Sequence, residues 1–182
     1  MKIRNGFVSN SSSSSFVVVF PKEPKSQSDV QKMLFDDNEY YGDPYSEEKY
    51  TTNQVAETVW KDIQQQKPND YKTAFDAVRN GYFDGHVDVD YNKIPKKNDK
   101  IDWNIYNRQQ KIVDKLNDKL AKGILDKTIN ARKLKMRHLQ GIKEFDSVYY
   151  VFSYADEDGG YFSALEHGNL FDKLNHIRVS YH

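Results

Sequence analysis

The apolar run from Phe16 to Phe20 constrains the fold of this 182-residue chain more than any other feature. Its five residues, Phe-Val-Val-Val-Phe, are aromatic or β-branched, and no polar residue alternates with them. A strand with this pattern is buried on both faces, so other elements must cover both sides of its sheet. Pro21 and Pro24 end the run, because proline cannot donate to a strand ladder. Five serines, Ser11–Ser15, lead directly into the run, which is typical of a loop packed against a sheet rather than of a flexible tag.

The remaining periodicity predicts strands at both ends of the chain and helices between them. We expect helices over 28–35, 52–66, 68–81, 102–122 and 125–139, with Ser28 capping the first and Thr52 or Asn53 capping the second. Strand-like patterns cover 84–91, 147–154, 161–165 and 177–181. This order favours an α+β fold with a small, mostly antiparallel sheet, in which the N-terminal strand joins a C-terminal hairpin. We expect a single domain over 1–182 with a helical insert at about 52–140.

Composition excludes several classes of function. Lys and Arg together number 27, as do Asp and Glu, so net charge gives no reason to bind nucleic acid or an acidic membrane. The absence of cysteine excludes disulfides, thiolate zinc sites and cysteine nucleophiles. The longest purely apolar run has five residues, which is too short for a membrane span or a secretory signal. We therefore expect a soluble, cytoplasmic protein.

The serine block is the first candidate site. Successive hydroxyls and backbone N–H groups can surround an anion, and Arg4 can add a charged hydrogen bond. The predicted ligand-binding residues are Arg4, Ser11, Ser12, Ser13, Ser14 and Ser15. Phosphate loops usually precede a helix, whereas a strand follows here, so a structural turn or a low-complexity terminus is the alternative.

The second candidate site is a polar cluster near the C-terminus. Carboxylates and imidazoles can together hold a divalent metal ion and activate a water molecule. The predicted metal ligands are Asp156, Asp158, Glu166, His167 and His182. No fixed-spacing metal motif supports the set, and the alternative is a solvated turn at Asp156–Asp158. On a strand, the neighbours Glu166 and His167 would point to opposite faces.

Two weaker candidates are explained more simply as polar surface. His86 shares one face of its expected strand with Asp84, Asp88 and Asp90, as exposed strand faces commonly do. The basic segment Arg132–His138 could contact nucleic acid or an acidic protein, but zero net charge favours a solvated helix face.

The first residues resemble a known group of proteins. The stretch Met-Lys-Ile-Arg over 1–4, followed by Gly-Phe-Val-Ser-Asn-Ser-Ser-Ser-Ser-Ser-Phe over 6–16, is similar to the start of a group of bacterial and bacteriophage proteins. The Asp-Glu-Asp-Gly segment at 156–159 and Glu166-His167 look like a second, weaker shared element. The resemblance implies that the serine block is integral and that the setting is the cytoplasm of a bacterial host, but it carries no catalytic roles.

Three functions follow as hypotheses. The first is a binding protein with a polar site for a phosphate-bearing small molecule or a host protein, formed by the serine block and the C-terminal strands. The second is a metal-dependent hydrolase, such as a nuclease or phosphodiesterase, with a divalent metal as its cofactor. The third is a virion or assembly protein without catalysis. A phage setting would connect the binding protein with takeover of the host.

Overall fold

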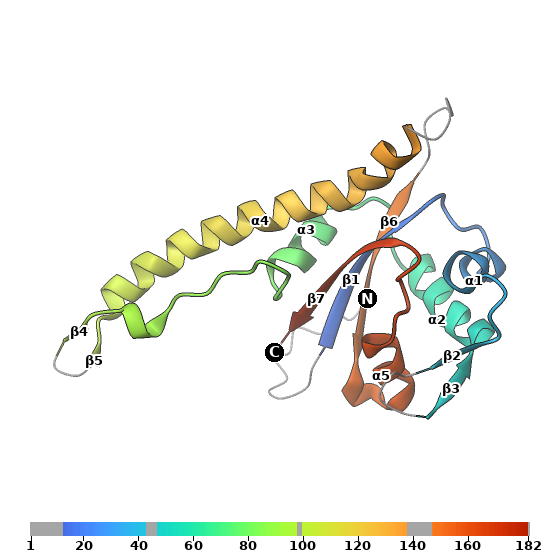
Figure 1. The fold of residues 1–182 in the computed structure, drawn as a ribbon, viewed down its shortest axis with the longest axis horizontal. Coiled ribbons are helices and arrows are strands. Elements are labelled where there is room, and N and C mark those ends of the chain that lie inside the picture. The colour runs from blue at the N-terminus through green and yellow to red at the C-terminus, as the bar shows by residue number, and fades with distance from the viewer. Residues whose placement is uncertain (1–12, 43–46, 98–99, 138–146, 182) are drawn as a thin grey trace.

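A computed structural model describes residues 13–42, 47–97, 100–137 and 147–181, and of residues 131–137 it describes the backbone alone. The chain has an α+β fold (Figure 1). The strands are β1 (Ser13–Phe20), β2 (Tyr40–Gly42), β3 (Lys49–Thr51), β4 (Lys96–Lys97), β5 (Lys100–Ile101), β6 (Val148–Ala155) and β7 (Asn175–Tyr181). The helices are α1 (Gln27–Phe35), α2 (Thr52–Gln64), α3 (Tyr71–Arg79), α4 (Trp103–Arg137) and α5 (Gly160–His167), with short 3₁₀ turns η1 (Tyr91–Lys93) and η2 (Asp156–Asp158).

The main sheet has three antiparallel strands in the order β6-β1-β7. The apolar run occupies β1 and is buried over its full length, which confirms the prediction of a strand buried on both faces and joined by C-terminal strands. The predicted C-terminal hairpin of 147–154 with 161–165 is wrong, because 161–165 lies in helix α5 and β6 and β7 lie on opposite sides of β1. Both partner strands come from the last 35 residues of the described chain, so closing the sheet requires contacts between the two ends of the sequence.

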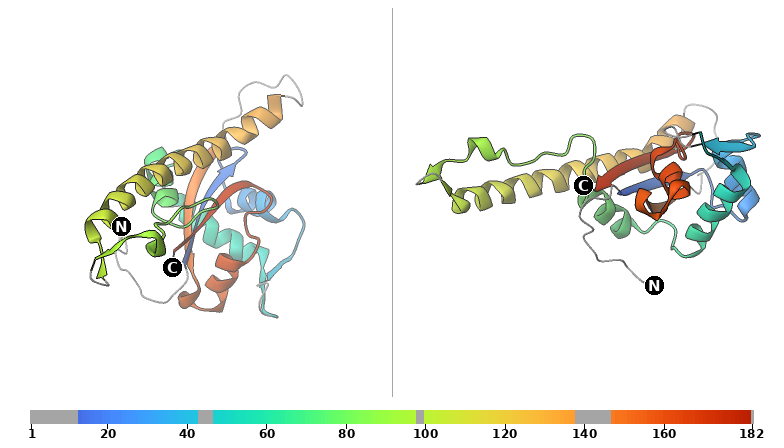
Figure 2. Two further views of the ribbon diagram at one scale, coloured as in Figure 1. Left: turned by 60° about the vertical axis from the view of Figure 1, so that its left-hand side comes forward. Right: turned by 90° about the horizontal axis from the view of Figure 1, so that it is seen from below.

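Helices cover both faces of this sheet (Figures 1 and 2). The even-numbered side chains of β1, Phe16, Val18 and Phe20, pack in a core with α1, α2 and α5. The odd-numbered side chains, Val17 and Val19, pack in a second core with α3 and α4. Alternation along one strand therefore divides the interior into two cores, as a strand buried on both faces requires.

The helix starts differ slightly from the predicted ones. Ser26, rather than Ser28, caps α1 by accepting a hydrogen bond from the Asp29 N–H. Thr51, rather than Thr52 or Asn53, caps α2. Thr52 instead donates its hydroxyl to a backbone carbonyl and is buried, so its side chain is committed to packing. Such caps satisfy the first N–H groups of a helix that have no partner within it.

A single helix replaces the two helices predicted over 102–139. α4 continues through Gly123, which we expected to end the first of them. A glycine costs a helix interior only about 1 kcal/mol, and packing of Ala121 and Leu125 against the sheet offsets this cost. The N-terminal part of α4 extends beyond the sheet, accompanied by η1, β4 and β5 (Figure 1).

Two predicted strands are absent from the described residues. Residues 161–165 lie in α5, where Ala164 and Leu165 are buried, so Glu166 and His167 end a helix and not a strand. Gly159, with φ of 109°, provides the turn between η2 and this helix. Residues 84–91 are irregular up to η1, so the even-numbered acidic residues there do not share a strand face.

The outer edge of β6 is closed by side-chain amides. The Tyr149 N–H donates to Asn69 Oδ1 at 2.9 Å, and the Asn69 N–H donates to the Tyr149 carbonyl at 3.1 Å. The Val151 N–H donates to Gln66 Oε1 at 3.0 Å. Asn69 adopts φ of 62°, a left-handed conformation that asparagine tolerates better than most residues. At Tyr149 and Val151 these contacts take the place of a neighbouring strand and hinder pairing with another chain.

Candidate functional site

The serine end of β1 meets three other parts of the chain in space. Ser14 pairs with Tyr154 of β6 and with Ser180 of β7. β6 leads into Asp156, α5 ends at Glu166 and His167, and Arg178 lies on β7 opposite Phe16. We name Ser14, Asp156, Glu166, His167 and Arg178 the sheet-end cluster.

Glu166 is the buried centre of the sheet-end cluster. It is only 1% exposed. Its Oε1 accepts a hydrogen bond from the Ser14 hydroxyl at 3.1 Å, and its Oε2 accepts one from the Asp156 N–H at 2.8 Å. A buried carboxylate requires such donors, because ionised groups are costly to remove from water. Glu166 thus joins the end of α5 to the ends of β1 and β6.

Arg178 supplies the positive charge beside this carboxylate. Its guanidinium lies 5.7 Å from the centre of the Phe16 ring, within the range of a cation–π contact. Its Nε and Nη2 each donate to the Ser14 hydroxyl oxygen at 3.3 Å, and Nη2 lies 3.4 Å from His167 Nδ1. Ser14 therefore accepts from Arg178 and donates to Glu166. No carboxylate of the described residues forms an ion pair with Arg178.

Three members of the cluster could hold a metal ion. One ligand atom from each of Asp156, Glu166 and His167 lies within 4.8 Å of the other two. His167 Nε2 is 3.9 Å from Glu166 Oε2. Two carboxylates and an imidazole form a donor set compatible with Zn²⁺ or Mn²⁺. Within the described chain, no other group of His and acidic residues meets this geometry.

A second polar pair, half-buried, connects β6 with α2. The Tyr154 hydroxyl donates to Asp62 Oδ2 at 3.1 Å. Burial raises the pKa of the Asp62 carboxyl above its ordinary value, and the hydrogen bond from Tyr154 partly opposes this shift. Burial, followed by the negative charge of Asp62, raises the pKa of Tyr154 well above that of a free tyrosine. This pair fixes β6 to α2 beneath Ser14.

Only some of the predicted anion-binding residues are described by the structure, and one of them lies in the sheet-end cluster. Arg4, Ser11 and Ser12 lie outside the described residues. Ser13–Ser15 belong to β1, so this part of the serine block is a strand and not a loop. Of these, Ser14 enters the sheet-end cluster. Ser15 faces the other core, where its hydroxyl lies 2.6 Å from that of Ser153.

The structure brings together three of the five predicted metal ligands. Asp156, Glu166 and His167 come together, whereas Asp158 in η2 does not join their group, and His182 lies outside the described residues. Because Glu166 and His167 are on a helix, the expectation that only one of them faces a given ligand does not apply.

Arg178 is the residue that sequence reasoning missed. Its only signal was alternation on the predicted strand 177–181, which places Arg178 and Ser180 on one face. Nothing in the sequence indicated that this face meets Phe16 and Ser14, because that depends on the register between β1 and β7.

Of the two weaker candidates, the structure describes the side chains of the His86 segment alone. His86 packs against the rings of Tyr82 and Phe83, and its Nε2 lies 3.5 Å from the Asp88 carboxylate and 3.4 Å from the Asn117 amide. It therefore helps to attach the irregular segment to α4. The basic segment 132–138 lies in and just beyond the last turns of α4, where side chains are not described.

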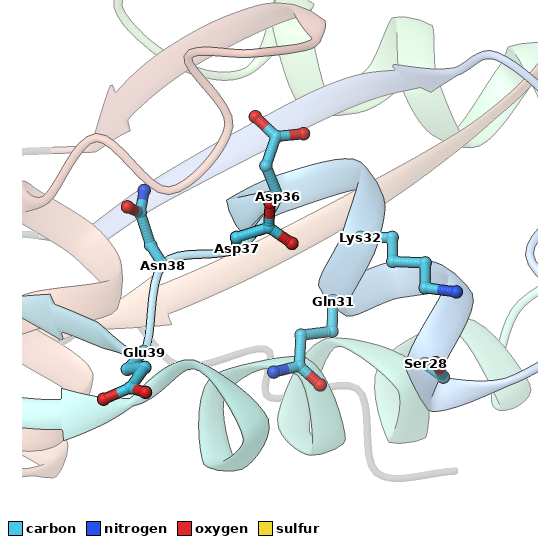
Figure 3. Close-up of a pocket in the computed structure, with 7 residues that line it drawn as sticks. All are labelled: Ser28, Gln31, Lys32, Asp36, Asp37, Asn38 and Glu39. Carbon is cyan, nitrogen blue, oxygen red and sulfur yellow. The ribbon is translucent and has the colours of Figure 1, made fainter.

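Two hollows on the surface of the described residues lie away from the centre of the sheet-end cluster. One, of about 310 Å³, lies between α1 and β2 and is lined by Ser28, Gln31, Lys32, Asp36, Asp37, Asn38 and Glu39 (Figure 3). Its labelled side chains point in different directions, and Asp36 pairs with Lys173 at 2.5 Å. The other is a groove of about 530 Å³ between α4 and β7. Neither coincides with the sheet-end cluster, although Arg178 borders the second.

Comparisons with protein-family models, curated proteins and solved structures found no match to this chain. No helix in the described ranges has both the length and the apolar character needed to cross a bilayer. The chemistry of the sheet-end cluster is therefore the basis for assigning a function.

Proposed function

We propose that this chain is a binding protein that holds a phosphate-bearing ligand at the sheet-end cluster. The observation that carries the proposal is the environment of Arg178. Its guanidinium is positioned by Phe16, Ser14 and His167, yet no described carboxylate neutralises it directly. The bacterial or bacteriophage resemblance and a cytoplasmic setting belong to the same proposal.

Arginine suits this role because its planar guanidinium can donate two parallel hydrogen bonds to a phosphate. Ser14 does not supply a proton to the ligand, since its hydroxyl donates to Glu166. It instead orients the Nε edge of Arg178. His167, with a side chain 24% exposed, can add a further donor from the open side.

Titration with inorganic phosphate and with a phosphate monoester tests the proposal, with binding measured by calorimetry and thermal shift. A ligand at 100 times its Kd should stabilise the fold by about 2.7 kcal/mol. The Arg178→Gln variant should lose this stabilisation, whereas Lys72→Gln, which removes an exposed charge on α3, should retain it. Equal binding by wild type and Arg178→Gln would refute the site.

A metal-dependent phosphoesterase is a second candidate, favoured by the grouping of Asp156, Glu166 and His167. A bound divalent ion would supply an activated water, and Arg178 would stabilise the charge on the phosphate. Chelator-treated protein should then gain thermal stability with Mn²⁺ or Zn²⁺ and hydrolyse a phosphodiester such as bis(p-nitrophenyl) phosphate. Asp156→Asn should abolish both effects and Asp172→Asn, on an exposed turn, neither. Phosphate binding without any effect of metal would support the binding protein and refute the metal-dependent phosphoesterase.

A further inference from the structure

The two edge strands of the main sheet, β6 and β7, differ in how far their outward backbone groups have hydrogen-bond partners. Asn69 and Gln66 occupy the backbone groups on the outer edge of β6. On β7, Tyr82 is the one described residue outside the sheet that does so: the Tyr82 N–H donates to the Ser180 carbonyl at 2.8 Å, and the Ser180 N–H donates to the Tyr82 carbonyl at 3.0 Å. Tyr82 thus forms the first rung of a fourth strand.

That fourth strand stops after one rung. The chain turns away through Asp84 and Gly85, which has φ of 89° and thus adopts a conformation that favours glycine. Backbone groups in an antiparallel strand point alternately to its two neighbours. Since Ser180 points outward, the N–H and C=O groups of His176 and Arg178 point outward too. In the described part of the chain, no strand pairs with them.

The groove of about 530 Å³ follows this open edge. Five consecutive residues, Leu174 to Arg178, form one side of it. Phe83 and Ile124 contribute apolar surface from the opposite side. Four residue steps of β7 span about 13 Å, enough to pair with four or five residues of an extended chain. An extended segment could therefore continue the strand that Tyr82 begins.

The charges around the groove define the partner. Lys127 carries a fixed positive charge, Arg178 adds a second beside the groove although its guanidinium rests on Phe16 and Ser14, His176 adds an imidazole, and Asp84 is the one acidic residue of the lining. We propose that the β7 edge binds an extended protein segment with alternating apolar and acidic residues, which adds as a fourth strand. Main-chain hydrogen bonds would supply the pairing, and Lys127 would select the acidic side chains. Pairing between two copies along this edge would bring the two Arg178 side chains near each other, and their like charges oppose it.

Fluorescence anisotropy of a labelled, blocked (Glu-Val)₃ peptide with the full chain tests the proposal. We expect saturable binding, weakened by about tenfold or more when alternate peptide amides are N-methylated or when lysine replaces glutamate, because each change removes a contact worth about one factor of ten. Equal binding of the N-methylated peptide would overturn strand addition, and equal binding of (Lys-Val)₃ would overturn the acidic partner. No binding of any peptide would overturn both.

Variants locate the interaction. His176→Pro removes an outward N–H without breaking the β1 ladder, so it should weaken binding about tenfold more than His176→Ala, which loses the same imidazole but keeps that N–H. If His176→Pro does not fold, Thr128→Arg takes its place, because the longer side chain would fill the groove from α4 and should weaken binding. Asn130→Arg, at an exposed position of the same helix, is the control and should not weaken it. Unchanged binding by these variants would overturn the location.

A concentration-dependent dimer that blocks the peptide would show that a second copy is the occupant. Phosphate binding, measured separately, distinguishes failure of this proposal from failure of the anion site.

Discussion

Glu166 offers the sharpest test of how the sheet-end cluster contributes to stability. We predict that Glu166→Ala strongly destabilises the fold, whereas Glu166→Gln costs much less. In the alanine variant, the Asp156 N–H and the Ser14 hydroxyl lose their acceptor at a position only 1% exposed. In the glutamine variant, the amide oxygen still accepts from the Asp156 N–H, and the amide nitrogen can donate to Ser14.

The magnitudes follow from these hydrogen bonds. Leaving a buried donor without a partner costs about 1–3 kcal/mol, so two donors and the cavity predict a loss of about 3–5 kcal/mol for Glu166→Ala. Removing a buried charge offsets part of this loss in both variants. For Glu166→Gln, the exchange of charge-assisted for neutral hydrogen bonds predicts about 1 kcal/mol. For a chain of this length, each kcal/mol lowers the Tm by about 2–4 °C.

Urea unfolding, followed by circular dichroism and tyrosine fluorescence, measures both variants against wild type. The expected result is a lower unfolding midpoint, with an unchanged dependence on urea concentration and a larger effect for alanine than for glutamine. Equal losses in the two variants, or a loss below about 0.5 kcal/mol for Glu166→Ala, would refute the reasoning, because a surface position gives effects of that size.

Three further predictions concern the frame around the site. Asn69→Ala should cost about 1–3 kcal/mol in urea unfolding, since the Tyr149 N–H loses its acceptor and alanine tolerates a φ of 62° poorly. Asp62 has a pKa raised by burial, so its contribution to stability is full below its ordinary value of 3.8 and is lost as the pH rises through the folded pKa. Asp62→Asn should therefore become more stable relative to wild type as the pH rises from 3.5 to 7, and Tyr154→Phe, which leaves the carboxylate without its donor, should not. Gly81→Ala should cost about 1–3 kcal/mol in thermal unfolding, because its Cβ would collide with the Val179 side chain of β7.

Part of the site could be predicted from residue types alone. Asp156, Glu166 and His167 were identified as a cluster because carboxylates and imidazole are metal ligands, and the structure brings these three together. Ser13–Ser15 do lie beside the C-terminal strands, since they pair with β6 and β7. The expected geometry was wrong: the described serines form a strand, and the two neighbours end a helix. The segment that forms α5 has only eight residues and a glycine on either side, so its apolar content does not decide between a strand and a helix.

The sequence by itself determined a strand buried on both faces, the division of the chain into terminal strands and a helical middle, and hence the α+β class. These properties depend on local periodicity and on the need of Phe16–Phe20 to be covered on both faces. Only the tertiary structure decided that β1 lies between β6 and β7, that α4 continues through Gly123, and that Arg178 meets Ser14. Each of these results from contacts between residues far apart in the chain, whose register is set by packing of the whole core and leaves no local pattern.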